Sequence, residues 1–95
     1  MIPRLLFSPE ALADLEQAAD WYGSKSEPIR VAFLSNLDLL FDRILAFPTS
    51  APIHRDKIRR ALMGKFPYGV FFVVDEVSVK ILAVMHLKRN PRTQA

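Results

Sequence analysis

Cysteine is absent from this 95-residue chain, and its absence excludes several kinds of chemistry at once. Without thiols the chain has no disulfide bond, no thiolate nucleophile and no cysteine-ligated zinc. The two histidines, His54 and His86, have no second ligand at metal-binding spacing. We therefore expect no metal site and no cofactor.

Long apolar runs and targeting signals are also missing. No run is long enough to span a membrane, and residues 1–4 lack the charged and apolar regions of a signal peptide. We expect a soluble, cytoplasmic protein with no membrane contact. Repeats, low-complexity stretches and linkers are absent, and 51% of the residues are hydrophobic. Residues 1–95 are therefore expected to form one domain with a single core.

Charge is distributed unevenly along the chain. Residues 1–50 contain four Lys and Arg against seven Asp and Glu, a net charge of −3. Residues 51–95 contain nine against three, a net charge of +6. This split predicts an anionic partner for the second half. The alternative is ordinary solvation of a small domain.

The first half has the signals of a short strand and two helices. Residues 2–7 are typical of a strand, and Ser8, followed by proline at the first helical position, is a strong N-cap. This helix should end at Gly23. A second helix should begin at Pro28 and end at Phe47, because the proline after Phe47 disfavours helical backbone angles there. The apolar stripes expected on the two helices are Leu12, Leu15, Ala19 and Tyr22, then Phe33, Leu37, Leu40, Phe41 and Ile44.

The second half changes to the two-residue period of strands. Residues 55–63 are expected to form one strand with a charged face. Residues 68–74 and 77–85 are almost continuously apolar, which predicts two central strands. The resulting order, β-α-α-β-β-β, predicts an α+β fold in which an antiparallel helical hairpin packs on a mostly antiparallel four-stranded sheet. The first strand should join an edge of the final three-strand meander.

Several motifs occur together, in one order, over nearly the whole chain. They are residues 7–11 (FSPEA), the Trp21-Tyr22 pair, residues 58–60 (IRR), residues 66–72 (FPYGVFF), and residues 83–86 (AVMH) followed by Arg89 and Pro91. In these motifs the chain resembles the RelE/ParE superfamily of bacterial type II toxins, and most closely its ParE-like branch.

The resemblance implies a toxin that a cognate antitoxin neutralises by wrapping a flexible segment around its surface. ParE-like members are reported as poisons of DNA gyrase, whereas RelE-like members cleave messenger RNA on the ribosome. A third alternative is an inactive member that only binds its antitoxin. Because one fold serves all three, the choice depends on the site residues.

RNA cleavage would need groups for proton transfer and for stabilising the phosphate in the transition state. The resemblance assigns phosphate stabilisation to Arg89 and to Arg60, with Arg59 as the alternative to Arg60. Residues 93–95 contain no aromatic or acidic side chain of the kind that RNA-cleaving members carry. We therefore expect a non-enzymatic inhibitor. If the chain is a nuclease, the proton-transfer candidates are Lys57, Lys88 and His86.

A binding surface is the alternative to chemistry. Residues two apart on a strand share one face, so Arg55, Lys57 and Arg59 are expected to align against phosphates or acidic antitoxin residues. His86 belongs either to the edge of the core or to this basic surface. Trp21 is either a core-edge residue or an exposed contact. The residues expected to contact the target or the antitoxin are Arg55, Lys57, Arg59, Arg60, Lys88, Arg89, Arg92 and Trp21.

Overall fold

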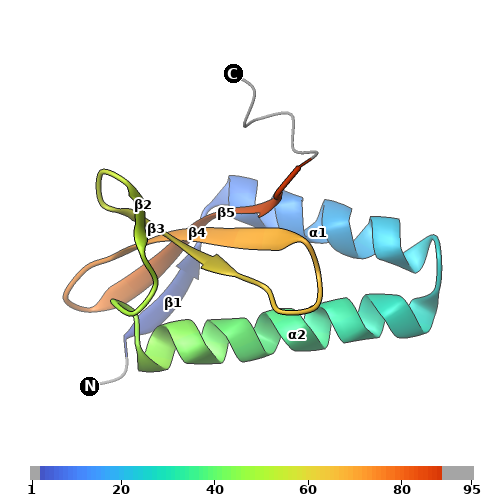
Figure 1. Ribbon diagram of the computed structural model, residues 1–95, viewed down its shortest axis with the longest axis horizontal. Coiled ribbons are helices and arrows are strands. Elements are labelled where there is room, and N and C mark those ends of the chain that lie inside the picture. The colour runs from blue at the N-terminus through green and yellow to red at the C-terminus, as the bar shows by residue number, and fades with distance from the viewer. Residues whose placement is uncertain (1–2, 89–95) are drawn as a thin grey trace.

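Two helices pack on a five-stranded sheet in the computed structural model, which describes residues 3–88 (Figure 1). The elements are β1 (Arg4–Phe7), α1 (Pro9–Gly23), α2 (Glu27–Ala46), β2 (Ile53–Arg55), β3 (Ile58–Leu62), β4 (Tyr68–Val74) and β5 (Ser78–His86). The strand order across the sheet is β1-β5-β4-β3-β2. β1 is parallel to β5, and every other pairing is antiparallel. The predicted α+β class and the edge position of the first strand are confirmed, with five strands in place of four.

The helices form an antiparallel hairpin whose connection lies at the opposite end of the molecule from the β2–β3 hairpin (Figure 1). Within the described residues, neither helix combines the length and the apolar character needed to cross a membrane.

The single strand expected over residues 55–63 is instead a β-hairpin. Arg55 at the end of β2 pairs with Ile58 at the start of β3, so the chain reverses at Asp56 and Lys57. Asp56 has a φ of 54°, in the left-handed region that aspartate tolerates better than most residues. The charged residues of this turn fit the two-residue period of the strands on either side. For that reason the sequence pattern predicted one long strand and not a turn.

The core lies between the helical hairpin and one face of the sheet. Alternate residues of β4, namely Tyr68, Val70 and Phe72, are buried against the helices. The expected stripe of α2 is confirmed, since Phe33, Leu37, Leu40, Phe41 and Ile44 are all buried. The stripe of α1 differs from the expectation. Its buried residues are Ala11, Ala18, Ala19 and Tyr22, whereas Leu12 is 47% exposed.

A β-bulge lies in the middle of β5. In the pairing with β4, Phe72 lies opposite Ile81 and Phe71 lies opposite Ala83. Leu82 therefore has no partner in β4, as expected of a bulge residue. β1 pairs with β5 only as far as Ile81. From Leu82 onward, the outer edge of β5 needs another source of hydrogen bonds, because an unpaired buried backbone group is costly.

The side chains of Ser8, which precedes α1, and of Asp14, within α1, supply those hydrogen bonds. The Ser8 Oγ donates to the Leu82 carbonyl at 3.0 Å, and the Asp14 carboxylate accepts from the Val84 N–H at 3.0 Å. Ser8 also accepts from the Ala11 N–H at 3.0 Å, which confirms its predicted role as N-cap. These contacts fix the rotation of α1 about its axis. They turn the small side chain of Ala11 toward the sheet and Leu12 toward solvent.

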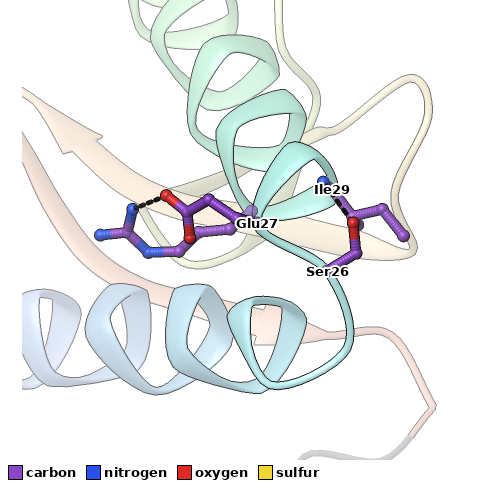
Figure 2. Close-up of polar contacts among 4 residues, drawn as sticks. Ser26, Glu27 and Ile29 are labelled. Atoms are coloured by element: carbon purple, nitrogen blue, oxygen red, sulfur yellow. Dashed lines mark hydrogen bonds and ion pairs between the residues drawn. The ribbon is translucent and has the colours of Figure 1, made fainter.

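The start of α2 is an exposed counterpart of this arrangement (Figure 2). The Ser26 Oγ accepts from the Ile29 N–H at 3.4 Å, and Glu27 forms an ion pair with Arg30 at 3.3 Å. Neither contact reaches the sheet. Ser8 and Ser26 are thus both N-cap residues, but only Ser8 also binds a strand of the sheet.

The turn between β4 and β5 is organised by Asp75. Its Oδ1 accepts from the N–H groups of Val77 at 2.8 Å and Ser78 at 2.7 Å, and its Oδ2 accepts from the Ser78 hydroxyl at 2.9 Å. The hydrogen bond from the Val77 N–H, followed by those from Ser78, lowers the pKa of the Asp75 carboxyl below its usual 3.8.

Replacing Ser8 by alanine should destabilise the protein more than the same change at Ser26. Ser8→Ala removes a helix cap and also leaves the Leu82 carbonyl without its donor, so we expect a loss of about 2–3 kcal/mol. Ser26→Ala should cost about 0.5–1 kcal/mol, because it removes one exposed, long hydrogen bond. Urea denaturation of the three proteins measures both values. Equal losses would contradict a structural link between Ser8 and β5.

The Asp75 turn should make stability depend on pH below 3.8. A lowered pKa means that the contribution of Asp75 is complete above the unfolded value of 3.8 and is lost as the pH falls through the lower, folded value. The melting temperature of the wild type should therefore approach that of Asp75→Asn in this acid range. Glu76→Gln, which removes a carboxylate from the same turn, is the matched control and should keep the wild-type slope. An Asp75→Asn melting curve with the same acid slope as the wild type would refute this role.

Candidate functional site

Arg59 is a structural cation of the sheet. Its Nη1 donates to the carbonyls of Thr49 at 3.1 Å and Ala51 at 2.6 Å, which ties the loop after α2 to β3. Arg59 lies opposite Phe72, a buried residue that faces the helices. Its side chain therefore lies on the helical side of the sheet and already has two acceptors.

The other cations of the expected row do not lie on the same strand as Arg59. Arg55 ends β2 and Lys57 lies in the turn, and both are exposed. Arg60 follows Arg59 in β3, so its side chain leaves the opposite face of the sheet. The prediction of three cations aligned on one strand is thus wrong, because the β2–β3 turn reverses the chain between them.

A second set of candidates meets at the end of β4 where Tyr68 lies. His86 is directly opposite Tyr68, with ring centroids 5.1 Å apart, and its Nδ1 accepts from the Lys88 N–H at 3.0 Å. Of the two alternatives for His86, these contacts favour the edge of the core. A Cβ on the neighbouring Gly69 would lie 3.2 Å from Leu87 and 3.4 Å from Arg60. The absence of a side chain at Gly69 therefore lets both residues pack over β4.

The candidate residues for RNA cleavage do not form one group. Lys57 lines a shallow hollow with Val74 and Asp75 at the far end of β4, whereas His86 pairs with Tyr68 at the near end. β4 has seven residues, so its ends lie roughly 20 Å apart at about 3.3 Å per residue. Arg60 and Lys88 lie nearer to His86 than Lys57 does. Arg89 and Arg92 lie outside the described residues.

Trp21 is exposed near the end of α1. Its side chain is 43% accessible, the Lys25 Nζ lies 5.2 Å from its ring centroid, and its ring packs edge-on against Tyr22. Of the two alternatives left by the sequence, the structure thus supports the exposed one. Whether Trp21 contacts a partner stays a prediction.

The sequence did not point to a hollow of about 250 Å³ beside the C-terminal end of α2. Its walls are the last turns of α2, the following loop and β3. The lining residues are Leu40, Arg43, Ile44, Phe47, Ser50, Ala51, Pro52, Arg60, Ala61 and Leu62. The one available signal was Phe47, a large apolar residue placed just after the predicted helix end, where the core no longer covers it.

The sequence of this chain matches a known protein family. The model of the family described as "ParE toxin of type II toxin-antitoxin system, parDE" matches residues 5–91. The chain belongs to the ParE toxin family. This confirms the resemblance seen in the motifs, and in particular its ParE-like branch. The chain is thus a ParE-type toxin of a type II toxin-antitoxin system, a family that implies an antitoxin partner.

A solved structure supports the same architecture for this ParE-type chain. The match is to a chain from the chromosomal ParDE TA system from P. aeruginosa, with a TM-score of 0.79 and 16% sequence identity. The alignment covers 92% of this chain and 98% of that chain. At this identity the likeness shows the fold. No curated protein matches the chain.

Removing Arg59 should affect stability, whereas removing Arg55 should not. Arg59→Ala frees two carbonyls of the loop after α2 and should cost about 1–3 kcal/mol. Arg55→Ala removes the same charge from an exposed position and should change stability by less than about 0.5 kcal/mol. Urea denaturation of both variants tests the assignment. A stable Arg59→Ala protein would mean that the arginine is available for a partner after all.

Proposed function

We propose that this ParE-type toxin stops growth by binding DNA gyrase without cleaving a substrate, and that a cognate antitoxin neutralises it. The observation that carries the proposal is the family match over residues 5–91. Since gyrase acts on the bacterial chromosome, the proposal also implies action in the cytoplasm.

The arrangement of the described residues supports binding over catalysis. Lys57 is roughly the length of β4 away from His86, so the two cannot serve one reaction centre. His86 uses Nδ1 to accept the Lys88 N–H. Within residues 3–88, two of the proton-transfer candidates are therefore separated from each other, and one nitrogen of His86 is engaged in a local contact.

Ribosome-dependent cleavage of messenger RNA is the second candidate, and one observation favours it. The Arg60 stem and Leu87 both contact the surface over Gly69, next to the strand pair of Tyr68 and His86. Arg60 on β3, a candidate for phosphate binding, and the His86 imidazole on β5 thus lie on the two strands that flank β4. A functional test has to separate this candidate from gyrase inhibition.

The antitoxin segment that binds this chain is expected to be acidic. Residues 51–95 carry a net charge of +6, and they include β3, β4 and β5. A flexible acidic segment would gain both electrostatic attraction and apolar burial as it folds on this surface.

Expression of the chain alone should stop growth, and co-expression of the protein from the adjoining reading frame should restore it. Leu37→Asp is the control for the burden of expression, because it places a charge at a core position that is 1% exposed. This variant should allow normal growth. Normal growth with the wild-type chain would indicate an inactive family member.

The purified chain should inhibit DNA supercoiling by gyrase at stoichiometric excess, and added antitoxin should relieve that inhibition. Toeprinting of translated messenger RNA should show no cleavage in the ribosomal A site. Unchanged supercoiling would contradict the gyrase assignment. A-site cleavage that disappears in Arg60→Ala would establish the nuclease instead.

A further inference from the structure

The hollow beside α2 lies against the edge of β3, not against a face of the sheet. Arg60, Ala61 and Leu62 are consecutive, so their side chains alternate between faces, yet all three line the hollow. Residues whose side chains leave opposite faces of a sheet can border one hollow only at the edge of the strand. The opposite wall is the last part of α2.

The backbone of β3 is unpaired at this edge. The Arg60 N–H donates outward to the Pro52 carbonyl, and the Met63 N–H donates inward to the Tyr68 carbonyl on β4. Since these directions alternate along a strand, the N–H and C=O groups of Leu62 point outward, away from β4. β2 pairs only with Ile58 and Arg59, and within residues 3–88 no hydrogen bond from the Leu62 N–H is present.

Apolar side chains are left exposed around this open edge. Phe47 is 65% exposed and Leu62 is 50% exposed, while Leu40 and Ile44 form the buried base. A cavity of about 150 Å³ holds a benzene ring, and small-molecule sites are usually about 300–1,000 Å³. The volume here, about 250 Å³, fits one or two side chains of a peptide.

A cation lies at one wall of the same hollow. It is Arg43, in the last turn of α2. Arg60 also borders the hollow, but its side chain leaves the other face of the sheet and packs over Gly69. Among the described residues, the one ion pair joins Glu27 and Arg30, so Arg43 is not neutralised by an acid. Its guanidinium matches a carboxylate placed next to an apolar side chain.

We propose that this hollow anchors an extended acidic segment of the antitoxin. One apolar side chain of the segment fills the space between α2 and β3, a carboxylate beside it contacts Arg43, and the backbone of the segment pairs with Leu62. An extended segment fits because the unpaired groups belong to the edge of a strand. The backbone groups of a helix are already hydrogen-bonded within the helix, so a helix cannot pair with that edge. The inference rests on the proposed neutralisation by an antitoxin and specifies its site.

Binding of the purified protein from the adjoining reading frame, measured by calorimetry, tests the charge requirement. The variant Arg43→Ser should weaken binding by about tenfold or more. Lys80→Ser removes the same charge from β5, away from the hollow, and should weaken binding by less than about threefold. Thermal melts verify that all proteins are folded.

The results of this binding experiment distinguish a wrong binding site from a wrong proposed function. If the wild type binds no antitoxin, the proposed neutralisation fails, and the inference fails with it. If the wild type binds but Arg43→Ser binds equally well, the inference alone is wrong. Equal weakening by Arg43→Ser and Lys80→Ser would show general charge attraction and would also overturn the site.

A chemical footprint gives a second test that does not depend on charge. The chain has no cysteine, so Ser50→Cys places a unique thiol in the hollow. Bound antitoxin should slow maleimide modification of this thiol by about tenfold or more, whereas a thiol in Glu76→Cys, at the β4–β5 turn, should react at its free rate. An unprotected thiol at position 50, or equal protection at both positions, would refute the proposal. Protection that appears without antitoxin and rises with toxin concentration would assign the hollow to a second copy of this chain.

Discussion

The hydrogen bonds from α1 to the bulged half of β5 are the constraint on which the rest of this structure depends. β1 ends its pairing at Ile81, so the outer edge of β5 has no neighbouring strand from the bulge at Leu82 onward. Ser8 and Asp14 replace that strand. Because each unpaired buried group would cost about 1–3 kcal/mol, α1 is held at one position and one rotation against the sheet. The short turn to α2 then directs the second helix antiparallel to the first.

This placement of α1 gives the sheet two edges of different character. The edge of β5 beyond β1 is closed by side chains of α1. The edge of β3 beyond β2 is open at Leu62, where the end of α2 lies close enough to form a hollow but not to complete the strand. Unpaired strand edges are places where proteins add strands from partners. In this toxin the same helical hairpin therefore closes one edge and shapes the other into a candidate docking site.

Sequence reasoning was most successful where a local rule decides the structure. The N-cap at Ser8, the apolar stripe of α2 and the two central strands follow from capping, helical period and apolar density, and all are confirmed. The turn at Asp56 and Lys57 was missed because its charges fit the alternation of a longer strand. The exposure of Leu12 was missed because the helical period does not fix which side of α1 faces the sheet. The contacts of Ser8 and Asp14 with β5 decide that side. The hollow depends on how the end of α2, the following loop and β3 pack against one another, which no local pattern reports.

Amide hydrogen exchange of the free protein, followed residue by residue by NMR, tests the contrast between the two edges most directly. The Val84 amide should exchange only when the protein unfolds, because Asp14 holds it at the closed edge. The Leu62 amide should exchange at least about 100-fold faster, because its edge is open. Comparable protection of the two amides, or faster exchange at Val84, would contradict the account.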